Sequence, residues 1–222
     1  FKTSLALQPI ATALFSNSPF IEGKISNYSS LRAYTWTDTD SKRSGFPDIV
    51  FSKGFGYEAW TEYLLSVPMY FVYRDGIYHD VAGKSFRDFM AGKLEGFEGA
   101  RPHMGDWADH MTTNFPEVRL KKYIEMRGTD GGPWKNLCAL PAFWVGLLYD
   151  SDAQQAAWDF VKDWTDVERE DMRRRVPVEG LSTKFRNTTL QQLAKQVLLI
   201  SSRGLKNRGN LDAAGNDESG FL

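Results

Sequence analysis

The sequence predicts an α+β fold built on an antiparallel sheet. Segments with strand-like alternation are interspersed with segments of helical periodicity, but they do not follow the strict order that βαβ units require. By the same criterion the last third of the chain is helical. The chain has 222 residues, of which 42% are hydrophobic, and this is enough for one large core. We therefore expect a single domain over residues 1–222.

The first half of the chain mixes helical and strand patterns. Residues 4–15 carry apolar side chains at helical spacing, whereas residues 17–30 are rich in Ser, Asn and Gly and predict a loop. The aromatic and β-branched run at residues 67–73 predicts a strand that turns at 74–76 and returns over 77–80 as a hairpin. The other segments expected here are a short strand over 31–38, an exposed polar stretch over 37–45, and helices over 55–65, 85–94 and 106–113.

Residues 118–127 have the most distinctive pattern, because apolar and charged side chains alternate as in a strand. Glu125 and Arg127 are two residues apart, so a strand directs both to one side, roughly 7 Å from each other. A carboxylate there could bind Mg²⁺, and the arginine could pair with a phosphate or a substrate carboxylate. A cross-strand salt bridge on a solvent-exposed sheet is the alternative, and spacing leaves both open.

The segment RGTDGGPW (127–134) predicts a glycine-rich turn after this strand. Its glycines would let backbone amides approach a ligand closely, although a tight turn without a ligand fits equally well. It does not match the phosphate-binding pattern GxxxxGK[ST], which occurs nowhere in the chain. Beyond it we expect helices over 134–149, 153–164, 166–175 and 188–203, the third with a capping box of Thr165 and Glu168.

Arg32 and Tyr70 lie among aromatic residues on two of the predicted strands. An arginine beside Tyr34 and Trp36 suits a small carboxylate ligand in a partly apolar pocket. An arginine stacked on an exposed aromatic ring is the alternative.

Composition excludes several classes of partner. The formal net charge is −1, so no overall field draws the chain to nucleic acid or to an anionic membrane. The longest apolar run, residues 137–149, is too short to span a bilayer. Cys138 is the single cysteine, so no intrachain disulfide can form, and we expect a buried thiol and a reducing, cytoplasmic location. The chain opens without methionine and closes on a polar tail, so we expect a fragment.

Six segments together match one known family. They are ALQPIATALFSNSPF (6–20), LRAYTWTDTD (31–40), VPMYFVYRDGIYHD (67–80), SFRDFMAGKL (85–94), DWADHMTTNFPEVRLKKYIEMRGTDGGPW (106–134) and LCALPAFWVGLLYD (137–150). These segments closely resemble glutamate–cysteine ligase of the type shared by plants and many proteobacteria. The resemblance runs in register from about residue 5 to residue 222.

The resemblance implies a fold and an activity. The family folds like glutamine synthetase, with an antiparallel sheet curved into a funnel and surrounded by helices, of which this chain would hold the C-terminal part. It joins the γ-carboxylate of L-glutamate to the amine of L-cysteine through a γ-glutamyl phosphate, using ATP and Mg²⁺, in the first step of glutathione biosynthesis. Phosphoryl transfer needs charge stabilisation rather than a protein nucleophile. This agrees with the absence of a nucleophile motif.

Site roles follow from the resemblance position by position. Arg32 and Tyr70 match the residues that hold glutamate, and Trp36 is expected to wall that pocket. Glu125 matches the strand carboxylate that coordinates magnesium. Arg127 matches the catalytic neighbour that contacts phosphate or the acyl-phosphate intermediate.

Two further positions border the same turn. Asp130, which is expected to help bind the ATP cofactor, and Trp134 are both weaker candidates. The resemblance also sets limits, because family members carry an N-terminal half with metal-binding acidic residues. The 222 residues alone are therefore expected to be inactive. The cysteine pair of plant members, thought to act as a redox switch, falls on Val81 and Gly96 here, which implies a bacterial-type enzyme without that control.

The expected partners are small molecules, namely L-glutamate, L-cysteine and ATP, without nucleic acid or membrane. The expected location is the cytoplasm, or a plastid if the chain comes from a plant. Two other functions stay open: a non-catalytic module that binds a small ligand, and an inactive homologue with the same fold. The sequence does not reveal the oligomeric state.

Overall fold

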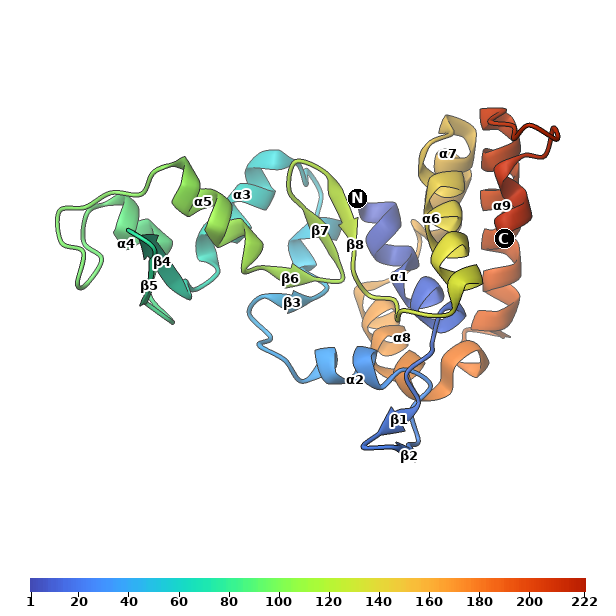
Figure 1. Ribbon diagram of the computed structural model, residues 1–222, viewed down its shortest axis with the longest axis horizontal. Coiled ribbons are helices and arrows are strands. Elements are labelled where there is room, and N and C mark those ends of the chain that lie inside the picture. The colour runs from blue at the N-terminus through green and yellow to red at the C-terminus, as the bar shows by residue number, and fades with distance from the viewer. The chain divides into compact units, whose positions relative to one another are not determined.

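The computed structural model describes residues 1–222. The chain divides into two compact units, each described here by itself. Unit 1 comprises Phe1–Asp38 and Met126–Leu222, and unit 2 comprises Thr39–Glu125. Figure 1 labels most of their helices and strands. The expectation of a single domain stays a prediction.

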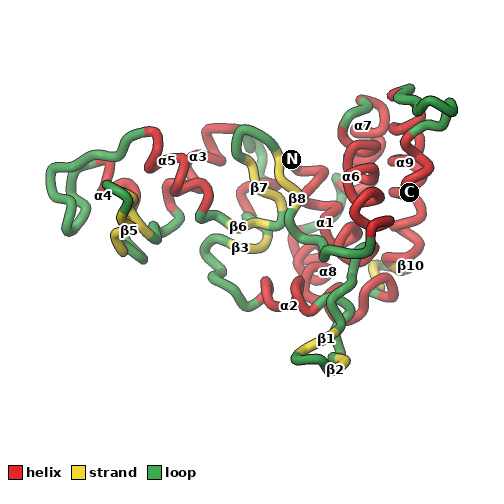
Figure 2. Tube along the Cα trace, in the orientation of Figure 1, coloured by secondary structure: helices red, strands yellow, loops and turns green.

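Unit 1 is mainly helical, as the red segments of Figure 2 show. Its helices are α1 (Lys2–Leu14), α2 (Leu31–Thr37), α6 (Trp134–Leu148), α7 (Ser151–Val161), α8 (Asp166–Glu179) and α9 (Leu190–Arg208), with the 3-10 helices η2 (Gly180–Ser182) and η3 (Glu218–Phe221). Its strands form the antiparallel pairs β1 (Phe20–Ile21) with β2 (Lys24–Ile25) and β9 (Lys184–Phe185) with β10 (Thr188–Thr189). Helix α1 packs against α7, α8 and α9 and is buried from Thr3 to Ala13, so it is the central helix of this unit.

Helices α6 and α9 pack most closely at two glycines. A Cβ added at Gly204 would lie 1.9 Å from the Gly146 carbonyl oxygen, and the backbone of Ser201 blocks a Cβ at Gly146 in the same way. The Ser201 hydroxyl donates to the Phe143 carbonyl at 2.9 Å, which fixes the register of the two helices. This crossing therefore requires glycine at both positions.

Unit 2 combines short helices with short strands. Its helices are η1 (Asp48–Phe51), α3 (Tyr57–Ser66), α4 (Phe86–Met90) and α5 (Met104–Thr112). Its strands are β3 (Ser44–Gly45), β4 (Phe71–Arg74), β5 (Ile77–Asp80), β6 (Phe115–Pro116) and β7 (Val118–Leu120), and β8 (Ile124–Met126) spans the boundary between the units. Strand β3 pairs with β6 in parallel, β4 and β5 form an antiparallel hairpin, and β7 pairs with β8.

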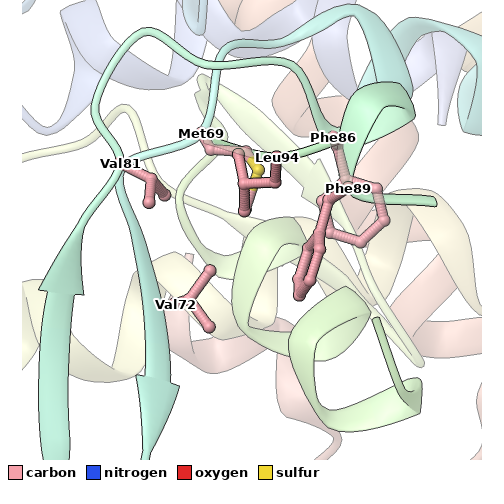
Figure 3. Packing of buried hydrophobic residues seen from close by; sticks show 6 residues of the cluster. All are labelled: Met69, Val72, Val81, Phe86, Phe89 and Leu94. Carbon is pink, nitrogen blue, oxygen red and sulfur yellow. The ribbon is translucent and has the colours of Figure 1, made fainter. Parts of the chain in front are cut away.

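One apolar cluster lies between the β4–β5 hairpin and α4 in unit 2 (Figure 3). Its buried members are Met69, Val72, Val81, Phe86, Phe89 and Leu94. Each is at most 2% exposed, so their burial contributes on the order of 1.5–3 kcal/mol per large side chain. Val81, one of the two positions at which plant members were expected to carry cysteine, is part of this core.

Most of the expected elements are confirmed, including the hairpin over 77–80 and the helices of the last third. The strand expected over 31–38 is wrong, because these residues form α2 after the N-cap Ser30, whose side chain accepts a hydrogen bond from the Ala33 amide. The single strand expected over 118–127 is divided into β7 and β8 by a turn, closed by the Lys121 amide bonded to the Tyr123 carbonyl. The funnel-shaped sheet stays a prediction. None of the helices combines the length and apolar character needed to cross a bilayer.

Candidate functional site

Arg32 has the most informative surroundings of the predicted site residues. It lies in the first turn of α2, and its guanidinium Nη2 donates to the Arg127 carbonyl at 2.6 Å. Its other terminal nitrogen, Nη1, is buried and has no hydrogen-bond partner. An unpaired buried donor on a charged group is costly unless a hydrogen-bond acceptor satisfies it. Because a guanidinium pairs best with carboxylate or phosphate, Arg32 suits an anionic ligand.

Trp36 lies on the same helix as Arg32, although the strand expected for both residues is wrong. The two residues are four apart on α2, and this spacing puts their side chains on one face of a helix. Tyr34 turns elsewhere and stacks on Tyr28, with ring centroids 4.2 Å apart. The helix therefore retains Arg32 with Trp36 and removes Tyr34 from the predicted pocket.

The turn after Arg127 is fixed by contacts with the N-terminal part of unit 1. The Thr12 hydroxyl donates to the Gly128 carbonyl at 3.3 Å, and the Asn17 side chain donates to the Gly131 carbonyl at 3.0 Å. Asp130 is 6% exposed and its carboxylate accepts hydrogen bonds from the chain itself. Trp134, at the end of the turn, is 77% exposed. The predicted role of Asp130 in binding ATP stays a prediction, but its present bonds are all internal.

Tyr70 belongs to unit 2 and is engaged by a cation that sequence analysis missed. The Arg43 guanidinium lies 3.6 Å from the centre of its ring, and the Tyr70 hydroxyl donates to Asp40 Oδ2 at 3.0 Å. Arg43 is only 1% exposed, so the expectation of an exposed polar stretch over 37–45 is wrong at this position. The one local signal was the three-residue spacing of Asp40 and Arg43.

Burial and hydrogen bonding act in opposite directions on the Asp40 carboxyl. Burial favours its neutral form, but hydrogen bonds from Arg43, the Lys42 amide and Tyr70 outweigh this and lower the pKa of Asp40 below its ordinary value. Burial, and then the hydrogen bond to Asp40, raise the pKa of Tyr70. Tyr70 is therefore a neutral phenol that donates to a carboxylate, and Asp40 stays ionised.

Glu125 is held in an ion pair across β7 and β8. Arg119 Nε donates to Glu125 Oε2 at 2.9 Å, and Arg119 Nη2 lies 2.8 Å from the same oxygen. Arg119 is 8% exposed and also donates to the Thr112 carbonyl. This is the cross-strand pair that the alternative interpretation expected, with a buried arginine in place of a solvated one. The predicted metal role of Glu125 is not tested by it.

Within residues 1–222 no group of three or more His, Cys, Asp or Glu side chains is placed to hold a metal ion. Unit 2 does contain a hollow of about 410 Å³ with a mostly apolar lining that includes Leu65, Phe86 and Trp107. None of the predicted site residues lines it.

The structure brings four predicted residues together in unit 1: Arg32 with Trp36 on α2, and Arg127 with Asp130 on the adjoining turn. Tyr70 and Glu125 belong to unit 2. A joint site of all six stays a prediction.

Comparison with known proteins gives one family. The glutamate-cysteine ligase family 2 (GCS2) profile matches residues 1–222. The chain is 58% identical over 209 residues to glutamate–cysteine ligase B, chloroplastic, of Oryza sativa subsp. japonica, which covers 94% of this chain and 42% of that protein. It is 55% identical over 222 residues to the chloroplastic glutamate–cysteine ligase of Arabidopsis thaliana, covering 100% of this chain and 41% of that protein. The chain thus spans about two fifths of the length of these curated relatives.

The names of these relatives overturn one expectation. A cytoplasmic location was inferred from the single cysteine, but the relatives are named chloroplastic. The inference was wrong because scarcity of cysteine excludes an intrachain disulfide and does not distinguish one reducing compartment from another.

Proposed function

The chain belongs to glutamate-cysteine ligase family 2, and we propose that its protein joins the γ-carboxylate of L-glutamate to the amine of L-cysteine. This ligation is the first step of glutathione biosynthesis, and we propose that it proceeds through a γ-glutamyl phosphate made with ATP. The names of the relatives support the ligase activity, and their chloroplastic location supports a plastid for this protein too.

The observation that carries the proposal is the unpaired Nη1 of Arg32. A glutamate carboxylate at this nitrogen would accept a charge-assisted hydrogen bond and remove the cost of the buried donor. Because Nη2 is already bonded to the Arg127 carbonyl, the guanidinium plane is fixed before the ligand arrives. Such preorganisation lowers the entropic cost of binding. Trp36, on the same face of α2, would cover the apolar part of the ligand.

ATP with Mg²⁺ fits the chain only in part. Mg²⁺ commonly binds through one or two protein carboxylates together with substrate phosphates, and Glu125 offers one carboxylate, held by Arg119. When bound, ATP would supply the phosphoryl group that activates the γ-carboxylate. What the described residues do is hold glutamate and keep its carboxylate in place, through Arg32, with Arg127 as the proposed phosphate contact.

The test uses the protein encoded by the open reading frame that contains this chain. We expect phosphate release from ATP that requires both L-glutamate and L-cysteine, with γ-glutamylcysteine as the product. Replacement of L-glutamate by L-aspartate, which is one methylene shorter, is the matched control and should reduce turnover strongly. Glutamate binding without any phosphate release would refute the ligase and favour the non-catalytic module.

A further inference from the structure

The Asp130 carboxylate is buried and is used entirely within unit 1. Its Oδ2 accepts hydrogen bonds from the Asn17 backbone amide at 2.7 Å and from the Ser18 hydroxyl at 2.7 Å. Its Oδ1 accepts a hydrogen bond from the Ser30 hydroxyl at 2.8 Å. A buried carboxylate needs hydrogen-bond donors around it, and these three groups supply them. Asp130 therefore holds the two serines that flank the start of α2.

Each of these serine hydroxyls also accepts from an amide of α2. Ser18 Oγ accepts from the Arg32 amide at 3.1 Å, and Ser30 Oγ accepts from the Ala33 amide at 3.1 Å. A serine hydroxyl has one hydrogen to donate and lone pairs to accept. Since Asp130 takes both hydrogens, the lone pairs of both hydroxyls are left for the first turn of the helix.

The same turn binds Arg32 at its other end. The Arg127 carbonyl, three residues before Asp130, accepts from the Arg32 guanidinium at 2.6 Å. The backbone amide of Arg32 is thus fixed through Ser18 and Asp130, and its guanidinium is fixed by Arg127. Residues 127–130 therefore fix both the backbone amide and the guanidinium of Arg32, and so set the direction of its unpaired Nη1.

We propose that Asp130 is a positioning residue for glutamate: through Ser18 and Ser30 it holds the first turn of α2, and thereby Arg32, in the orientation that binds the substrate carboxylate. This inference rests on the proposed function, because it takes glutamate as the ligand of Arg32. In this proposal Asp130 acts through the serines and Arg32, without a contact of its own to glutamate.

The primary variant is Asp130→Asn. Its side chain is neutral and its NH₂ cannot accept, so at least one of the three hydrogen bonds is lost or must reverse, and none of them remains charge-assisted. We expect the KM for glutamate to rise about tenfold, the effect of losing one hydrogen bond to a charged group. We expect kcat and the KM for ATP to stay within about twofold, since a misplaced Arg32 weakens glutamate binding alone.

Two further variants test the link between Asp130 and Arg32. Ser18→Ala removes the hydroxyl and should raise the KM for glutamate in the same way, whereas Ser18→Thr keeps it and should retain most of the affinity. If Asp130→Asn does not fold, this pair carries the test. The matched control is Asp150→Asn: Asp150 caps α7 by accepting from the Ala153 amide at 2.8 Å, and Asn caps as well as Asp. It should leave all kinetic constants unchanged.

Amide hydrogen exchange at Arg32 and Ala33 gives a readout that does not need activity. We expect faster exchange of both amides in Asp130→Asn than in Asp150→Asn. Suppose that the unaltered protein is an active ligase. If neither Asp130→Asn nor Ser18→Ala then raises the KM for glutamate above that of the unaltered protein, the positioning role is refuted. If the unaltered protein has no ligase activity, the proposed function fails, and the exchange rates decide the inference: faster exchange supports it and unchanged exchange overturns it.

Discussion

Arg32 in unit 1 is half-buried and Arg43 in unit 2 is fully buried, and the two also differ in how their donors are used. The guanidinium of Arg43 donates to Asp40 at 2.6 Å, to the Pro68 carbonyl at 2.7 Å and to the Thr113 carbonyl at 3.2 Å. That of Arg32 donates to the neutral Arg127 carbonyl and leaves Nη1 buried without a partner. An unsatisfied donor alone does not mark a binding arginine, because Arg173 also has a buried, unpaired Nη1 but donates to the Glu170 carboxylate at 2.7 Å. Arg32 differs in that its unpaired donor is accompanied by a hydrogen bond to a neutral carbonyl.

The two arginines also differ in the group that balances their positive charge. Arg43 lies beside an ionised carboxylate, and its hydrogen bond is one of those that lower the pKa of Asp40. Its guanidinium also stacks on Tyr70, so a cation and a ring are already paired. Arg32 contacts a carbonyl oxygen, which leaves its positive charge to be matched by an anion. We therefore interpret Arg43 as a residue that holds unit 2 together and Arg32 as one that holds a substrate.

Removal of Arg43 should have the largest effect on stability. Arg43→Met leaves the partly buried carbonyl of Pro68 and the buried carbonyl of Thr113 without the arginine donor, and we expect the free energy of unfolding to fall by about 3 kcal/mol. Denaturant unfolding followed by tryptophan fluorescence measures this. The control is Arg101→Met, since Arg101 is exposed and should cost less than about 0.5 kcal/mol. Equal stabilities of the two variants would remove the contrast between Arg43 and Arg32.

Arg32→Met should weaken glutamate binding strongly and lower stability only a little, the opposite of what we expect for Arg43→Met. Loss of a charged hydrogen bond to substrate costs about 2–3 kcal/mol, so we expect the KM for glutamate to rise on the order of 50-fold or more. The loss of stability should stay near 1 kcal/mol, because a single carbonyl, that of Arg127, loses its donor.

Arg32→Lys sharpens this prediction. Lysine keeps the charge but not the planar fork that bonds Arg127 and a carboxylate together. We expect a KM for glutamate between those of the unaltered protein and Arg32→Met. An unchanged KM for glutamate in Arg32→Met would remove Arg32 from the site, whatever its hydrogen bonds.

The features that sequence analysis predicted correctly depend on neighbours along the chain. The capping box of Thr165 and Glu168 needs residues three apart, and both of its hydrogen bonds are present. The β4–β5 hairpin needs a turn between two apolar runs, and its register pairs Arg74 with Ile77. Such patterns can be read from a sequence because their partners lie in the same window.

The features that were missed depend on distant partners. Residues 31–38 contain β-branched and aromatic side chains, which favoured a strand. They form a helix whose cap, Ser30, is held by Asp130, 100 residues away. Arg43 looked like part of a solvated stretch because its partners lie up to 70 residues away, at Thr113. Tertiary contacts override local propensity at both places.

Acid should weaken unit 2 before unit 1. His110 is 5% exposed and its Nε2 lies 2.9 Å from the Leu64 carbonyl. Burial, with a smaller effect of the Arg43 charge, lowers the pKa of His110 below its ordinary value of 6.5. The unfolded chain therefore takes up a proton that the folded one refuses, so the free energy of unfolding falls as the pH drops below 6.5. For one proton, the free energy of unfolding can change by at most about 1.4 kcal/mol per pH unit.

The matching group in unit 1 responds at lower pH. Hydrogen bonds from Arg186 and from Thr165 outweigh burial and lower the pKa of Glu168 from 4.5 to about 2. The contribution of Glu168 to the free energy of unfolding is complete above pH 4.5 and is lost as the pH falls toward 2. Amide exchange compared at pH 7 and pH 5.5 should show that opening is faster at pH 5.5 in unit 2 and unchanged in unit 1. His110→Gln, which keeps an amide donor for Leu64 and cannot titrate, should flatten that change, and an equal response of both units would contradict the assignment.

The smallest expected effect separates the stability of unit 1 from the placement of Arg32. Thr165 caps α8 through a neighbour three residues away, so its loss should not disturb the Asp130 contacts that hold α2. Thr165→Ala should lower the free energy of unfolding by about 1 kcal/mol and leave the KM for glutamate unchanged, whereas Thr165→Ser keeps the cap and should change neither. A rise in the KM for glutamate in Thr165→Ala would mean that any loosening of unit 1 misplaces Arg32. The contrast would then lie between the two units as a whole, and the specific contacts of Arg32 would lose their significance.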